Sequence, residues 1–176
     1  TSGTTGPPKA AMITHRNILS LLRNQADMIT FYDDDISFSF LPMAHVAERV
    51  LAFYGRINTG LTTAYATSVG TVLEELGEVR PTIFGSVPRI YEKAYAKIHS
   101  EVEKTSPGVQ KIFAFAASVA RQAAPHFLRD EPLPLALKAK WALADRAVFT
   151  KVRGAFGGRV RYSVTGAAPT PIAPGR

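Results

Sequence analysis

The chain begins with TSGTTGPPK, residues 1–9, which combines two Gly, two Pro, four hydroxyl residues and one Lys in nine positions. Gly3 and Gly6 allow backbone conformations that turn amide N–H groups inward. The hydroxyl groups add hydrogen-bond donors and Lys9 adds a positive charge, so the stretch is suited to binding an anion such as phosphate. The spacing is not that of a Walker loop, because Lys9 comes three residues after Gly6 and no Ser or Thr follows it. Composition alone also fits a flexible linker.

The composition of the whole chain is that of a globular domain. The 176 residues are 46% hydrophobic and carry a net charge of +7, which favours anionic partners such as nucleotides, acidic cofactors or anionic lipid. The absence of Cys excludes disulfides, thiolate metal sites and a Cys nucleophile. No apolar run approaches the about 20 residues that span a bilayer, and no signal peptide is visible, so we expect a cytoplasmic protein.

Hydrophobic spacing alternates between strand and helix patterns along the chain. Apolar and small polar residues alternate at 36–41, as in a strand, after a turn that Asp33, Asp34 and Asp35 mark. The expected strands are residues 36–41, 62–66, 82–87 and 159–165, and the expected helices are residues 14–28, 44–58, 72–79, 88–102, 109–127 and 135–153. This order predicts an α/β fold in which a mostly parallel sheet is flanked by helices.

Four stretches resemble a single family. TSGTTGPPK resembles the phosphate-binding signature of the adenylate-forming (AMP-binding) superfamily, which includes acyl-CoA synthetases, peptide-synthetase adenylation domains and luciferases. FLPMAHVAER at 40–49 and GSVPRIYEK at 85–93 resemble its long-chain fatty acid–CoA ligase branch, and SVTGAAP at 163–169 resembles the strand and loop that lie against adenine. Members usually have Gly where this chain has Ala10, which we expect to affect loop flexibility and not the ligand contacts. The resemblance implies part of the large N-terminal domain of an adenylate-forming enzyme.

The resemblance also implies roles for individual residues. His45 is the expected catalytic residue, bordering the acyl pocket near the reacting carboxylate, although a His at this place can also cap a helix. The expected nucleotide-binding residues are Thr1, Ser2, Gly3, Thr4, Thr5, Gly6 and Lys9 around the ATP phosphates, and Gly166, Ala167 and Ala168 against adenine. Thr1 is the expected metal ligand. Glu48 and Arg49 can form an ion pair or orient His45, and the pattern does not separate these roles.

Two groups of side chains at helical spacing have more than one interpretation. The aromatic group indicates core packing, with an acyl-lining or lipid-facing role as the alternative; it consists of Phe113, Phe115, Phe127 and Trp141. The basic group indicates a solvated helix face, with peripheral contact to an anionic membrane as the alternative; it consists of Lys138, Lys140, Arg146, Lys151 and Arg153. Aromatic and basic residues do not interleave on a strand face, so we do not expect nucleic-acid binding.

The activity implied by the resemblance is the activation of a long-chain fatty acid with ATP, Mg²⁺ and coenzyme A. Neither step needs a protein nucleophile, which agrees with the absence of Cys. The chain starts mid-motif without Met and ends in a Pro-rich segment, so we expect residues 1–176 to be a fragment of the AMP-binding domain. The C-terminal domain with its catalytic Lys would lie beyond it, and we expect the fragment to be inactive alone. The alternatives are another adenylate-forming enzyme (a fatty acyl-AMP ligase or an amino- or aryl-acid adenylation domain) or a non-catalytic nucleotide-binding module.

Overall fold

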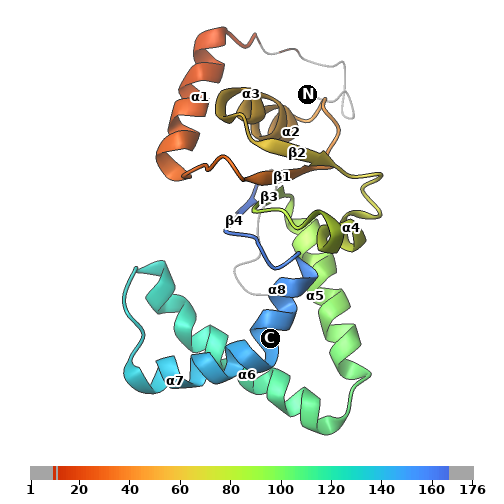
Figure 1. The fold of residues 1–176 in the computed structure, drawn as a ribbon, viewed down its shortest axis with the longest axis vertical. Helices are drawn as coiled ribbons and strands as arrows, with labels where there is room; N and C mark the ends of the chain where they lie inside the picture. The colour runs from red at the N-terminus through yellow and green to blue at the C-terminus, as the bar shows by residue number, and fades with distance from the viewer. Residues whose placement is uncertain (1–9, 11, 167–176) are drawn as a thin grey trace.

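The structure is a computed structural model that describes residue 10 and residues 12–166. Within these residues, four strands form one parallel sheet in the order β2-β1-β3-β4 (Figure 1). The strands are β1 (Ile36–Ser39), β2 (Thr62–Tyr65), β3 (Ile83–Ser86) and β4 (Tyr162–Thr165). Each lies inside a range expected from the sequence, so the prediction of an α/β fold with a mostly parallel sheet is confirmed.

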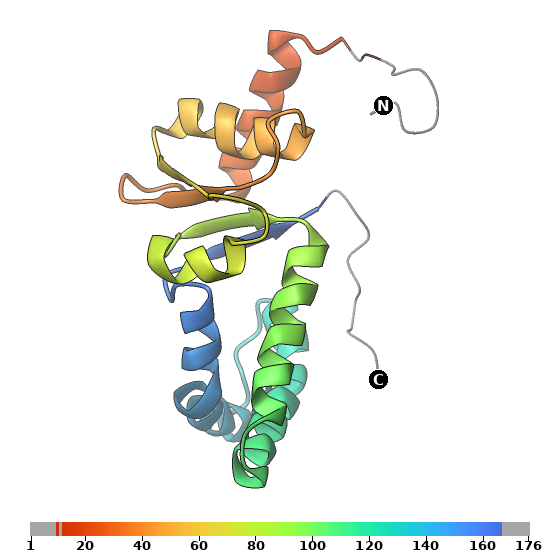
Figure 2. The same ribbon diagram turned by 90° about the vertical axis from the view of Figure 1, so that its right-hand side faces the viewer.

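Helices cover both faces of the sheet, as parallel strands require, because each crossover connection returns over one face. One face carries α1 (His15–Met28) and the helical run of α2 (Val46–Glu48), η1 (Arg49–Tyr54) and α3 (Gly55–Thr59). The opposite face carries α4 (Val72–Val79) and α5 (Pro88–Glu103), with α8 beside them (Figures 1 and 2). The remaining helical elements are α6 (Pro107–Leu128), α7 (Leu135–Ala144), η2 (Asp145–Phe149) and α8 (Thr150–Ala155).

Several helix ends follow from the local chemistry of single residues. Thr14 caps α1 through a capping box, in which Asn17 N donates to Thr14 Oγ1 at 3.2 Å and Thr14 N donates to Asn17 Oδ1 at 3.0 Å. Pro88 occupies the first turn of α5, where its missing N–H costs nothing. Gly60 ends α3 with a φ of 72°, a left-handed conformation that Gly adopts without strain.

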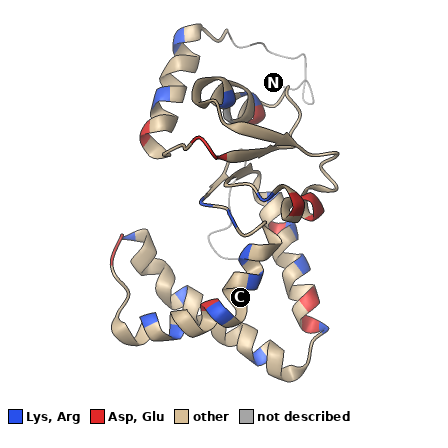
Figure 3. Ribbon diagram, viewed as in Figure 1, with Lys and Arg blue, Asp and Glu red and all other residues tan. Residues whose placement is uncertain are grey.

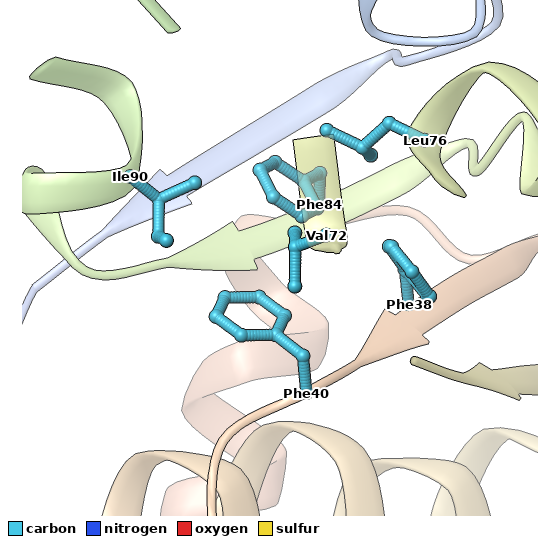
Figure 4. Close-up of a cluster of buried hydrophobic side chains, with 6 residues drawn as sticks. All are labelled: Phe38, Phe40, Val72, Leu76, Phe84 and Ile90. Carbon is cyan, nitrogen blue, oxygen red and sulfur yellow. The ribbon is translucent and has the colours of Figure 1, made fainter. Parts of the chain in front are cut away.

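The main core lies between the sheet and α4 and α5. Its buried members come from these elements and the end of β1; they are Phe38, Phe40, Val72, Leu76, Phe84 and Ile90 (Figure 4). The rings of Phe40 and Phe84 stack with centroids 5.9 Å apart, and Phe84 is fully buried. Burying a side chain of this size contributes about 2–3 kcal/mol, so this core fixes the sheet to its helices.

Two of the predicted helices contain a π-helical segment, which the sequence pattern did not indicate. The run expected over 44–58 includes η1, and the run expected over 135–153 includes η2. A π turn adds a residue to one turn of the helix, so the side chains after it face a new direction. After η2 the chain turns from the direction of α7 toward the sheet along α8 (Figure 1).

The helices α6, α7 and α8 extend away from the sheet and have a second small core (Figure 2). Ala116, Val119, Ala144 and Val148 are buried there. Of the aromatic group, Phe113 and Trp141 pack against this core, as predicted, but Phe115 and Phe127 remain 42% and 56% exposed. For Phe115 the core prediction is wrong. Phe127 contacts Trp141, with ring centroids 5.0 Å apart, but its exposure means that it is not a core residue either.

Charged side chains are distributed over both the sheet part and the helical extension (Figure 3). Of the basic group on the helices that follow residue 134, all five are exposed, as a solvated face predicts. Arg153 pairs with Asp145, with 2.6 Å between Nη1 and Oδ1. None of the helices in the described part of the chain is long and apolar enough to cross a bilayer.

Candidate functional site

A cavity of about 110 Å³ lies over one face of the sheet, between the sheet and the helices α1 and η1, and reaches the carboxyl end of the strands. Ligands of open α/β sheets bind at this end of the strands. Three of the stretches that resemble one family contribute to its wall: Leu41, Ala47 and Glu48 from the first, residues 85–87 from the second, and residues 164–166 from the third. The fold therefore brings together segments that are as far apart in sequence as β1 and β4.

The wall of this cavity is mostly apolar, and its sheet side combines large residues, Phe38 and Ile83, with small ones, Ser37 and Gly85. Phe38 contributes both to the cavity wall and to the core, whereas Phe84, the neighbour of Gly85, belongs to the core alone. Side chains alternate along a strand, so Gly85 faces the cavity and Phe84 faces α4 and α5. Small residues here leave space above the sheet, which an apolar ligand can occupy.

His45 stands at the start of α2 and caps it. Its Nδ1 accepts a hydrogen bond from Ala47 N at 3.2 Å, and its backbone is extended, with φ −78° and ψ 128°. In a neutral imidazole whose Nδ1 accepts, the proton is on Nε2, so Nε2 is a donor. His45 is half-buried and is not itself part of the cavity wall, although Ala47 and Glu48 are. The capping alternative is thus present in the structure, and it leaves Nε2 for a ligand.

Glu48 is buried and holds the loop that precedes His45. Ser39 Oγ donates to Glu48 Oε1, and Leu41 N donates to Glu48 Oε2 at 3.3 Å. Glu48 is only 5% exposed, whereas Arg49 is exposed. Within the described residues Glu48 makes neither an ion pair with Arg49 nor a hydrogen bond to His45. Both roles considered from the sequence are replaced by a third, in which Glu48 fixes the end of β1.

Gly166 follows β4 directly and lines the cavity together with Thr165. A Cβ at Gly166 would meet no atom within 4 Å, so the space beside it is open. Small residues of this kind let a flat ring approach the backbone. The other expected nucleotide-binding residues lie outside the described residues; they are Thr1, Ser2, Gly3, Thr4, Thr5, Gly6, Lys9, Ala167 and Ala168.

A metal site is not formed by the residues that the structure describes. No three His, Asp or Glu side chains come together between residues 12 and 166 in a way that could hold an ion. Thr1, the expected metal ligand, lies outside this range.

The amino end of the sheet carries a polar network that the sequence did not reveal. Asp35 is 1% exposed, and Arg161 Nη2 lies 2.5 Å from each of its carboxylate oxygens. Thr82 Oγ1 donates to Asp35 Oδ1 at 2.5 Å, and Tyr32 N donates to Oδ2 at 2.8 Å. Burial raises the pKa of Asp35, but the hydrogen bonds from Arg161, Thr82 and Tyr32 and the charge of Arg161 outweigh it and lower the pKa. The network joins the starts of β1, β3 and β4, opposite the cavity.

A second, larger groove of about 480 Å³ lies among α5, α6, η2 and α8. Its wall is formed mainly by alkyl side chains such as Ile98, Val102 and Ile112. None of the residues expected to bind nucleotide, metal or the reacting carboxylate lies in this wall. The cavity at the carboxyl end of the sheet is therefore the candidate site.

Comparisons with known proteins identify the family of the chain. A family model described as AMP-binding enzyme matches residues 1–174. The peroxisomal long chain acyl-CoA synthetase 6 of Arabidopsis thaliana is 36% identical over 96% of this chain and 23% of its own length. Fatty acyl-CoA synthetase B of Dictyostelium discoideum is 35% identical over 96% of this chain and 24% of its own length. Long-chain-fatty-acid–CoA ligase 1 of Homo sapiens is 33% identical over 96% of this chain and 23% of its own length. The chain thus spans about a quarter of the length of these relatives.

The fold also has a counterpart among solved structures. The adenylation domain of a carboxylate reductase from Mycobacterium chelonae matches 96% of this chain with a TM-score of 0.54, and the match covers 22% of that protein. The sequences are 24% identical, so the likeness concerns the fold. It agrees with the α/β fold that the sequence predicted.

Proposed function

Because the chain belongs to the AMP-binding enzyme family, we propose that the full-length protein converts a long-chain fatty acid into its coenzyme A thioester with ATP. In the first step a carboxylate oxygen of the fatty acid attacks the α-phosphorus of ATP. The bond to pyrophosphate breaks and an acyl-adenylate forms. In the second step the sulfur of coenzyme A attacks the acyl carbon, the thiol proton is lost, and AMP leaves. Mg²⁺, when bound, neutralises charge on the phosphates.

The observation that carries this proposal is the convergence of three sequence stretches on one cavity. Leu41 follows β1, Ser86 ends β3 and Gly166 follows β4, and all three line the same apolar space, which reaches the carboxyl end of the sheet. This is the end where a nucleotide and an apolar acid can meet, because the adenine-facing loop follows β4 and the helix that carries Glu48 follows β1. The relatives with named activities, which are acyl-CoA synthetases and ligases, support the same substrate class.

We assign His45 to the reacting carboxylate. Its Nδ1 is engaged by Ala47 N, so the proton on Nε2 is held in one direction by the start of α2. A preorganised donor of this kind orients a carboxylate oxygen for attack and contributes about 3 kcal/mol to stabilising charge in a dry site. Glu48 acts indirectly, because it holds Leu41 and so the segment that leads to His45.

The nucleotide is assigned to the same end of the sheet, beside the segment that follows β4. Gly166, with Ala167 and Ala168, would lie against the adenine ring, and the loop of residues 1–9 would hold the phosphates through Lys9 and its hydroxyl groups. Thr1 would contribute to Mg²⁺ binding. The charges on the triphosphate make a cationic, donor-rich loop the suitable partner.

The acyl chain is assigned to the cavity above Ser37 and Gly85. Ligand pockets usually measure about 300–1,000 Å³. At about 110 Å³, this cavity holds the part of the chain near the carboxylate, and a longer chain requires the side chains around it to move. Residues 1–176 are then one part of the AMP-binding domain, and a cytoplasmic location with peripheral membrane contact remains a prediction from the sequence.

The test is a substrate panel on the full-length protein, read by pyrophosphate release with and without coenzyme A. We expect release with saturated fatty acids of increasing length and formation of acyl-CoA when coenzyme A is present. Pyrophosphate release with fatty acids but no thioester would identify a fatty acyl-AMP ligase instead. Release only with amino or aryl acids would reject the assignment of the cavity to an acyl chain. No release with any acid would favour a non-catalytic nucleotide-binding module.

A further inference from the structure

The hydroxyl of Tyr91 joins α5 to both β3 and β4 close to the candidate site. It lies 2.7 Å from Ser163 Oγ, 3.2 Å from the carbonyl oxygen of Phe84 and 3.2 Å from the carbonyl oxygen of Val164. These partners belong to neighbouring strands, and Tyr91 is 72 residues from Ser163 in sequence. The contact therefore fixes the relative position of a helix and two strands at the carboxyl end of the sheet.

The arrangement of protons at this contact is determined by the number of donors. A phenol has one proton, so Tyr91 donates to one carbonyl oxygen at a time, and the Ser163 hydroxyl supplies a second hydrogen bond by donating to the phenol oxygen. Burial raises the pKa of Tyr91, and the hydrogen bond with Ser163 opposes this only in part. Tyr91 therefore keeps its proton at neutral pH and remains a donor.

The strand that Tyr91 holds is the one that needs an additional contact. In the described part of the sheet β4 pairs with β3 alone, so it is bonded along one side. Arg161 secures its amino end through Asp35. Tyr91 secures its carboxyl end, where Val164, Thr165 and Gly166 line the cavity. Ser163 faces α5 and Val164 faces the cavity, because side chains alternate along a strand.

We infer that Tyr91 is a positioning residue that sets where the carboxyl end of β4 presents Gly166 to the base of the nucleotide. The inference rests on the proposed function, in which the adenine ring lies against this segment. A hydroxyl that holds the strand from the face opposite the cavity affects the base without touching it. Its loss changes the binding of the nucleotide and the preference for adenine more than the binding of the acyl chain, which is assigned to the space above Ser37 and Gly85.

The direct test is Tyr91→Phe in the full-length protein. This variant keeps the ring, which packs edge-on against Phe84 with centroids 5.9 Å apart, and removes only the hydroxyl. We expect the KM for ATP to rise about twofold to tenfold, the range given by the loss of one hydrogen bond, and the KM for the fatty acid to rise less. The ratio of kcat/KM for ATP to that for GTP should fall.

The matched control is Tyr95→Phe on the same helix. Tyr95 is 46% exposed, and its hydroxyl makes no hydrogen bond to the described residues, so this variant should leave both KM values and the nucleobase ratio unchanged. Ser163→Ala should reproduce part of the effect, and combining it with Tyr91→Phe should add little, because both remove the same contact. Equal rises in the KM for ATP and for the fatty acid would overturn the inference, as would an unchanged KM for ATP.

Hydrogen exchange separates this inference from the proposed function. Backbone exchange of residues 162–166 should be faster in Tyr91→Phe than in the parent protein, and unchanged in Tyr95→Phe. Unchanged exchange in Tyr91→Phe would show that the hydroxyl does not hold β4, whatever the activity. If the parent protein released no pyrophosphate with any acid, the proposed function would fail. The positioning of β4 would still be decided by the exchange rates.

Discussion

Replacing Glu48 by Ala should destabilise the candidate site more than any other single change near His45. The substitution removes the acceptor of both Ser39 Oγ and Leu41 N. Ser39 and Glu48 are 4% and 5% exposed, so water does not reach the freed Ser39 hydroxyl, whereas Leu41 is half-buried. A buried donor left without a partner costs about 1–3 kcal/mol. The substitution frees two donors but also removes the buried charge of the carboxylate, so we expect a total loss of about 3 kcal/mol.

Two further variants serve as controls for the destabilisation by Glu48→Ala. Glu48→Gln keeps one acceptor oxygen for Leu41 N, and its amide can donate to Ser39 Oγ, so we expect a loss of only about 1 kcal/mol from exchanging charge-assisted bonds for neutral ones. Arg49→Ala removes an exposed neighbouring side chain and should change stability by less than about 0.5 kcal/mol. The predicted order of destabilisation is therefore Ala at 48, then Gln at 48, then Ala at 49.

The assay combines local stability with activity in the full-length protein. Hydrogen exchange of residues 39–47 should accelerate in this order. Fatty-acid-dependent pyrophosphate release should fall about 100-fold in Glu48→Ala, the effect of moving a positioning group by about 1 Å. If Glu48→Ala and Arg49→Ala had equal effects on exchange and on rate, the buried carboxylate would not hold the segment that leads to His45, and the reasoning would be refuted.

Three other substitutions test separate parts of the account. Gly157→Ala should lower the free energy of unfolding by about 3 kcal/mol or more, measured by thermal unfolding, because φ of Gly157 is 83° and a Cβ would lie 2.6 Å from the backbone of Arg80. Gly158→Ala, where φ is 73° and the space is open, should lower it by only about 1 kcal/mol. Equal losses in the two variants would contradict the clash at Gly157. Asp35→Asn should lower the free energy of unfolding most at neutral pH, and the difference in this free energy from the parent should shrink as the pH falls below about 4. The pKa of Asp35 is lowered in the folded state, so the stabilisation is present above the unfolded pKa and is lost as the pH falls through the folded pKa. A difference that denaturant titrations find to be independent of pH would argue against the ion pair. Lys9→Ala should lower the rate of adenylate formation about 100-fold, and an unchanged rate would reject the assignment of residues 1–9 to the phosphates.

The parts of the fold that the sequence predicts are those that depend on residues close together in the sequence. Thr14, Gly60 and Pro88 mark helix ends through their own backbone or side-chain chemistry, and the structure places the ends of α1, α3 and α5 there. The strands were visible because apolar and polar residues alternate in them. His45 and Gly166 were found through resemblance, and the structure brings the loop after β1 and the end of β4 to one cavity.

The parts that the sequence does not predict depend on partners far along the chain. Asp35 follows two other acidic residues in a turn and looks solvated, but its partner Arg161 lies 126 positions later. The sequence leaves Glu48 with two roles, an ion pair with Arg49 or the orientation of His45, whereas its hydrogen bonds go back to Ser39 and Leu41 at the end of β1. The π-helical segments were missed because one added residue in a turn leaves the composition of a helix unchanged.

The most direct test of the central claim is the fate of the fatty acid's oxygen. The full-length protein would be given ATP, coenzyme A and a long-chain fatty acid whose carboxylate carries heavy oxygen, and the products would be weighed by mass spectrometry. If the carboxylate attacks the α-phosphorus, the released AMP carries one heavy oxygen atom and the pyrophosphate carries none. Unlabelled AMP, or heavy oxygen in inorganic phosphate released together with ADP, would contradict adenylate formation.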